Sequence, residues 1–323
     1  MERIKKSAKW MEKAMNLLFL VCGLLTILSV MLITVFLVVS GIPAIRTIGF
    51  TDFLFGRVWA STAGNPSYGI LPFILTSVYG TCGAVLLGVP VGLLCAVFLA
   101  KMAPKKAAAI VRSVVDLLAG IPSVVYGLMG MILIVPWVRE AFHLPDGANL
   151  FSAMLVLAVM ILPSVISVSE TAIKAVPKEY EEASLALGAT KTETVFKVVV
   201  PAAKSGIATA IVLGIGRAVG EAMAVMMVAG NVANMPKLFG SVRFLTTAVA
   251  SEMAYSGGLQ RQALFSIALV LYLFILLINA ALNFFLKRDR KACHVRAHIL
   301  RPPVTTMLPG NAGAQCAPLQ ERR

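Results

Sequence analysis

The chain has 323 residues, of which 59% are hydrophobic and only 14% charged, with a mean hydropathy of +0.87. A soluble globular domain carries about 25% charged residues, so the composition excludes a soluble protein and predicts an integral membrane protein. The formal net charge of +14 would favour nucleic-acid binding in a soluble chain, but the positions of the charges indicate membrane topology instead.

Six apolar segments are long enough to cross a bilayer, for which a helix needs about 20 residues. They lie near residues 17–39, 72–99, 112–137, 150–170, 206–230 and 262–286. The sequence therefore predicts an all-α, polytopic membrane protein whose six-helix transmembrane domain covers residues 17–286. One tail precedes this domain at 1–16, and another follows it at 287–323.

Lys and Arg residues are concentrated on one side of the six segments. Both tails and the loops at 100–112 and 171–205 carry 22 of them, whereas the loops on the opposite side carry six. Because an excess of Lys and Arg marks the cytoplasmic side, both termini are expected in the cytoplasm. The tail from residue 287 contains prolines and scattered charges with little apolar periodicity, so we expect it to be disordered.

Small residues and prolines interrupt three of the predicted spans. Glycines in the second span and two rows of small residues in the fifth would let neighbouring helices approach closely in lipid. The rows in the fifth span are Gly206, Ala210 and Gly214, and Gly216 and Gly220. We therefore expect the fifth helix to lie at the centre of the bundle. In the third span, Pro122 would free a backbone carbonyl, which then needs another hydrogen-bond donor.

The fifth span also contains two ionisable residues, Arg217 and Glu221. A charge placed alone at the bilayer centre costs about 2.5–3.5 kcal/mol on insertion scales, so such residues pair with one another or line a substrate path. At positions i and i+4 the two side chains would share one helix face and could form an ion pair that fixes helix packing. As a substrate site, the planar guanidinium of Arg217 would suit an oxyanion, with Glu221 holding it until the anion arrives. Both interpretations are open from the sequence alone.

The sequence contains no pattern typical of catalysis or metal binding. The phosphate-binding string G-x-x-x-x-G-K-[ST] does not occur, and there is no Ser/His/Asp set. The five cysteines and three histidines lack metal-ligand spacing, so no metal and no cofactor are expected. We therefore expect a protein that is not itself an enzyme and that does not bind nucleic acid.

The polar loop between the fourth and fifth spans carries the most informative pattern in the chain. Glu182-Ala183-Ser184 is followed by Gly188 and, nine residues later, by Val-x-Val-Pro ending at Pro201. Glu182 could cap a short helix or form a salt bridge, and Ala183 is small enough for close docking. Gly188 permits a sharp turn, and Pro201 would begin the next helix. The arrangement resembles the EAA loop of ABC importer permeases, with conservative differences at Ser184 and at the two valines.

In that family the loop forms a short cytoplasmic helix that docks into a separate ATPase subunit, and the resemblance assigns this coupling role to residues 177–201. Three longer segments are also similar to one subgroup, the PstC group of phosphate-specific permeases. They are DLLAGIPSVVYGLMG at 116–130, VPKEYEEASLALGATKTET at 176–194 and GIGRAVGEAMAVMMVAGN at 214–231. The similarity covers roughly residues 70–286.

The resemblance implies a type I ABC importer permease that moves inorganic phosphate into the cell across the inner membrane. It implies as partners a second, PstA-like permease, an ATPase subunit dimer that hydrolyses the ATP, and an external phosphate-binding protein, all assembled in the lipid bilayer. Three alternatives stay open. The same architecture could carry another oxyanion such as sulfate or molybdate, or the chain could be a membrane signalling subunit that senses phosphate. A secondary transporter would need no ATPase partner.

Overall fold

The computed structural model describes the backbone of residues 2–61 and 64–299 and, within these ranges, the side chains of 12–61, 64–281 and 284. Most of the described residues are helical, with irregular connections such as 142–149 and 229–244, which confirms the predicted all-α membrane fold. The described chain also forms a short antiparallel ribbon of two strands, β1 (Trp59–Ala60) and β2 (Ser67–Tyr68).

Five helical stretches of the described chain are long and apolar enough to cross a membrane, and a sixth candidate is a bent pair. The five are Glu12–Ile48 in α1 (Glu2–Ile48), α3 (Leu71–Val97) with the π-helical turn η1 (Phe98–Met102), α5 (Ser123–Met129) with η2 (Gly130–Ile134) and α6 (Val135–Ala141), α7 (Leu150–Lys174), and Gly258–Ala281 in α14 (Gly258–Ile299). The bent pair joins Lys191–Ala202 to α11 (Lys204–Gly220) at an angle of 70°. The predicted number of six is reached when this pair counts as one span.

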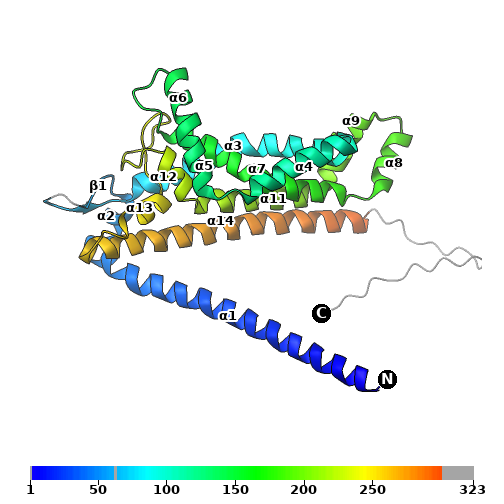
Figure 1. Ribbon diagram of the computed structural model, residues 1–323, viewed down its shortest axis with the longest axis horizontal. Helices are drawn as coiled ribbons and strands as arrows, with labels where there is room; N and C mark the ends of the chain where they lie inside the picture. The colour runs from blue at the N-terminus through cyan, green and yellow to red at the C-terminus, as the bar shows by residue number, and fades with distance from the viewer. Residues whose placement is uncertain (1, 62–63, 300–323) are drawn as a thin grey trace, which may run out of the picture.

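The remaining helical elements are shorter than the spans. They are α2 (Phe50–Phe55), α4 (Lys105–Gly120), α8 (Lys178–Ala186), α9 (Lys191–Thr194), η3 (Val195–Val199), α10 (Val200–Ala202), α12 (Met223–Val228) and α13 (Leu245–Glu252). Of these, α9, η3 and α10 make up the Lys191–Ala202 arm of the bent pair, and the others lie between spans. Figure 1 shows α8, α9, the start of α1 and the far end of α14 at one end of the molecule, with α2, α6 and β1 at the other. This placement agrees with an even number of crossings between the two ends of the described chain.

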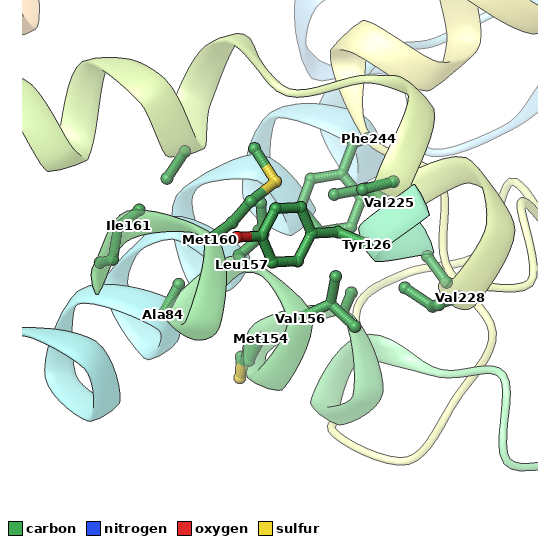
Figure 2. Close-up of a cluster of buried hydrophobic side chains, with 14 of the residues drawn as sticks. Ala84, Tyr126, Met154, Val156, Leu157, Met160, Ile161, Val225, Val228 and Phe244 are labelled. Atoms are coloured by element: carbon green, nitrogen blue, oxygen red, sulfur yellow. The ribbon is translucent and has the colours of Figure 1, made fainter. Parts of the chain in front are cut away.

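The centre of the bundle is α7, which packs along α3. Side chains of α7 and α3 form the main hydrophobic core together with residues of α5, α12 and Phe244 (Figure 2). The predicted close approach through the glycines of the second span is confirmed. A Cβ atom at Gly88 would lie 2.9 Å from the carbonyl oxygen of Ala158 on α7, so only glycine fits there without a shift.

The prediction for the fifth helix is half wrong. Gly206 and Gly214 do face α7, where added Cβ atoms would meet Ala172 and Val165. Gly216 and Gly220, by contrast, have nothing within 4 Å of an added Cβ. Only one row of small residues on α11 is a packing surface, so α7 rather than α11 occupies the centre of the bundle.

The helix break expected at Pro122 is present between α4 and α5. Proline has no N–H to donate to the carbonyl of Leu118, four residues earlier. The hydroxyl of the buried Tyr126 donates to this carbonyl instead, over 2.6 Å, and Tyr126 itself belongs to the main hydrophobic core (Figure 2). The freed acceptor is thus satisfied inside the protein, as a lipid environment requires.

The two ends of the chain differ in their packing. The described side chains of α1 from residue 12 to 33 are all exposed, and α1 meets α14 near its C-terminal end through Thr34, Phe36 and Gly41. The tail was expected to be disordered from residue 287 onward, but α14 continues as a helix to Ile299. The rest of the predicted tail, 300–323, lies outside the described residues.

Candidate functional site

The predicted coupling loop folds as two short helices joined by a tight turn. The first helix, α8, ends at Ala186, and Gly188 then adopts φ +87°, a left-handed conformation that favours glycine. The next helix, α9, begins with a capping box in which the Thr190 hydroxyl accepts from the Glu193 N–H while the Glu193 carboxylate accepts from the Thr190 N–H. The sharp turn expected at Gly188 is therefore present.

The residues of the Glu-Ala-Ser triplet occupy different environments on α8. Glu182 and Ala183 are exposed, and Glu182 forms no hydrogen bond or ion pair with another described side chain. Ser184 is partly buried, and its hydroxyl lies 3.0 Å from the hydroxyl of Thr194 on α9. The triplet thus presents two side chains outward and uses the third to hold α8 against α9.

Pro201 lies in the first turn of the three-residue helix α10, as expected of a proline at a helix start, but the long helix of the fifth span begins three residues later. The helix α10 follows directly from the π-helical turn η3. The chain bends by 70° after Ala202, and α11 starts at Lys204. Because proline fixes its own φ without ending a helix at its first turn, the bend falls two residues later.

Apolar side chains on α8 and just after it point away from the protein. Tyr180 is 55% exposed, Leu185 42% and Leu187 90%. No residue of α8 is buried. Grouped large apolar residues that stay exposed on a polar segment are typical of a surface that another protein covers.

Two ion-pair clusters near this segment were missed by the sequence analysis. Lys101 on η1 pairs with Glu181 on α8, and the buried Glu170 on α7 pairs with Arg112 on α4 and, at 2.5 Å, with Lys174. In the sequence these cations indicate only the cytoplasmic side of the membrane. The 80 residues between Lys101 and Glu181 leave no local spacing that would have revealed the pair. Of these pairs, only Glu170–Lys174 could have been predicted from the sequence, because residues at positions i and i+4 of a helix lie side by side.

Arg217 lies in the last turn of α11, where a cation is favoured by the negative end of the helix dipole. It lines a cavity of about 540 Å³ between α7, α11 and α14, together with Gly216. The polar side chains around this cavity are Ser164 from α7, Thr209 from α11 and Asn279 from α14. Among the described residues, Arg217 forms no ion pair or side-chain hydrogen bond. Its guanidinium is therefore available to a ligand in the cavity.

The expected pairing of Arg217 with Glu221 on one helix face is wrong. The helix ends at Gly220, and Glu221 adopts an extended conformation (φ −75°, ψ 130°), so the predicted span at 206–230 is broken. The Glu221 carboxylate accepts a hydrogen bond of 2.9 Å from the N–H of Ala224 and caps the start of α12. Its backbone carbonyl accepts from the Thr246 hydroxyl at 2.7 Å. Glu221 thus holds the chain where it leaves α11 rather than neutralising Arg217.

Comparison with known proteins agrees with this architecture. A family model described as "Binding-protein-dependent transport system inner membrane component" matches residues 88–291. A probable ABC transporter permease protein, YqgH of Bacillus subtilis, is 40% identical over 267 residues, which cover 80% of this chain and 86% of the relative. The phosphate transport system permease protein PstC of Pasteurella multocida is 32% identical over 286 residues, covering 80% of this chain and 89% of the relative.

Solved structures share the fold at low sequence identity. A chain of the MetNI methionine ABC transporter aligns with a TM-score of 0.55 and 20% identity, covering 68% of this chain and 95% of that chain. A chain of a bacterial alginate ABC transporter aligns with a TM-score of 0.56 and 15% identity, covering 85% and 92%. Together with the family match, these similarities show that the chain belongs to the binding-protein-dependent ABC importers as a membrane-spanning permease subunit, and that the ATPase is a separate subunit.

Proposed function

We propose that the chain is a permease of an importer for inorganic phosphate and that Arg217 contacts the anion on its path. The observation that carries this proposal is the position of the Arg217 guanidinium. It lines the cavity between α7, α11 and α14 without an ion pair to another described residue. An unpaired charge inside a membrane-spanning segment is costly, and such residues typically mark a substrate path.

The chemistry of the cavity suits a tetrahedral oxyanion. The guanidinium can donate two parallel hydrogen bonds to two oxygen atoms of one phosphate. Asn279 adds an amide, which both donates and accepts, and the hydroxyls of Ser164 and Thr209 add oxygen atoms that accept a hydrogen bond from a protonated phosphate. Relatives named as phosphate transport permeases, which are 30–32% identical to this chain, favour phosphate over other oxyanions.

In the proposed mechanism the ATPase subunits bind ATP, and the permease subunits form the path for phosphate. ATP binding closes an ATPase dimer on the cytoplasmic side, and the segment 177–201 transmits that movement to the membrane helices. In this segment Glu182, Ala183 and the exposed Leu187 face the ATPase, while Ser184 and Gly188 set the geometry of the turn. Phosphate delivered by an external binding protein then passes between this chain and a second, PstA-like permease. Both termini lie in the cytoplasm and the complex resides in the inner membrane.

The test is phosphate uptake in cells that lack their own system and that express this chain with its partner subunits. Arg217→Leu is compared with the wild type at matched membrane levels, and Arg261→Leu is the control because Arg261 lies outside the cavity. We expect uptake by the wild type and the control but not by Arg217→Leu. Uptake by all three would refute the role of Arg217. An assembled wild-type complex that imports sulfate or molybdate but not phosphate would refute the substrate, and regulation without any uptake would favour signalling.

A further inference from the structure

The coupling helix α8 is held to the rest of the protein by few contacts. None of its residues is buried, and a cavity of about 300 Å³ separates Tyr180 from Ala202 and Gly206. Among the side chains that the structure describes, two interactions bridge α8 to other elements. One is the Ser184–Thr194 hydrogen bond to α9, and the other is the Lys101–Glu181 ion pair to η1.

These two interactions lead to different parts of the membrane domain. Thr194 is the last residue of α9, and the chain then runs through η3 and α10 to the 70° bend that precedes α11. Lys101 instead belongs to the π-helical turn that extends α3 without interruption. Residues of η1 and the end of α3 are anchored by burial, with Leu99 4% and Val97 2% exposed. A displacement of Lys101 is therefore passed to a helix that is firmly packed.

The helix α3 connects this point to the opposite end of the molecule (Figure 1). Its 27 residues extend over about 40 Å at 1.5 Å per residue. Near its other end, the Ser77 hydroxyl accepts a hydrogen bond of 3.0 Å from the N–H of Leu245, and the ring of Phe244 lies against Gly80. Movement of α3 as a rigid element thus reaches the residues that follow the broken fifth span.

The electrostatic attraction between Lys101 and Glu181 is stronger than in an ordinary surface ion pair, because both side chains are largely shielded from water. The Lys101 side chain is 15% exposed and that of Glu181 is 25% exposed, so water screens the two charges only partly. By comparison, the Lys197–Glu193 pair of the same segment is 74% and 47% exposed. Pairs this exposed contribute little to stability.

We propose that Lys101 and Glu181 are positioning residues that join the coupling helix to α3, so that movement of the ATPase drives α3 as well as α11. Neither side chain contacts the substrate or the nucleotide in this scheme. Without the pair, α8 stays in contact with α9 and η3 but loses its side-chain link to α3, so that ATP hydrolysis is uncoupled from movement of α3. The inference rests on the coupling role proposed for residues 177–201.

The test uses the complete complex in proteoliposomes, with ATP hydrolysis and phosphate uptake measured on the same vesicles. The variants are Lys101→Glu, Glu181→Lys and the double reversal, which restores an ion pair of opposite polarity. We expect each single reversal to lower the uptake per ATP hydrolysed about tenfold, in the range of energies that couple contacting residues. The double reversal should restore this ratio to within about threefold of the wild type. A merely structural role would lower uptake and hydrolysis together.

The control is Lys197→Glu, which makes the same charge change in the exposed pair of the same segment and should leave the ratio unchanged. If a reversal prevents assembly, Lys101→Met and Glu181→Gln remove the pair without placing like charges together, and the same loss of ratio is expected. An unchanged ratio in the single variants, or a double variant no better than its parents, would overturn the inference. Failure of the wild type to import phosphate would instead overturn the proposed substrate, and the ratio would then be measured with the anion that is imported.

Discussion

The hydroxyl of Tyr126 offers a direct test of how the chain accommodates the break at Pro122. In the variant Tyr126→Phe the ring remains in the main hydrophobic core, where the tyrosine is 8% exposed, and only the hydrogen bond of 2.6 Å to the Leu118 carbonyl is lost. That carbonyl keeps one longer hydrogen bond, 3.3 Å from the N–H of Ile121. The lost bond and the partly unsatisfied acceptor together cost about 1–2 kcal/mol.

A loss of this size should lower the thermal unfolding midpoint of the purified protein in detergent by about 1–3 °C, because the entropy of unfolding grows with chain length. The matched control is Tyr79→Phe, which removes the same atom from a tyrosine that is 49% exposed and whose hydroxyl bonds to no described group. The control should leave the midpoint unchanged. An unchanged midpoint in Tyr126→Phe, or an equal fall in both variants, would show that the hydrogen bond at the break contributes nothing.

Two glycines provide further predictions. Gly88→Val should separate α3 from α7, because even its Cβ would lie 2.9 Å from the Ala158 carbonyl oxygen. Such overpacking costs about 1–3 kcal/mol and should lower the same unfolding midpoint, whereas Gly23→Val, with nothing within 4 Å, should not. Gly188→Val should reduce uptake at matched membrane levels, because a β-branched residue is strained at φ +87° by about 1–2 kcal/mol. Gly188→Asn should retain more uptake because asparagine tolerates that conformation, and equal uptake by both variants would argue against a role for the turn.

The sequence by itself determined the features that depend on local properties of the chain. The length of apolar segments located the second, fourth and sixth spans to within about five residues, but the third span starts at Ser123 rather than at 112, because α4 is a separate helix, and the fifth span breaks after Gly220. The lack of an N–H at Pro122 predicted the break between α4 and α5, and the need for φ > 0 explains why glycine stands at position 188. The absence of a Cβ atom at Gly88 and the other glycines of the second span predicted close helix packing, because a neighbouring backbone can approach them.

Only the tertiary structure decided which distant residues meet. The sequence spacing of Arg217 and Glu221 suggested an ion pair, but the helix ends between them and the Glu221 carboxylate caps α12 instead. The cavity at Arg217 combines three helices that are far apart in the chain, and the partners Lys101 and Glu181 belong to η1 and α8, which are also far apart in the sequence. Such contacts depend on how helices from distant parts of the chain pack together, which no local pattern of residues specifies.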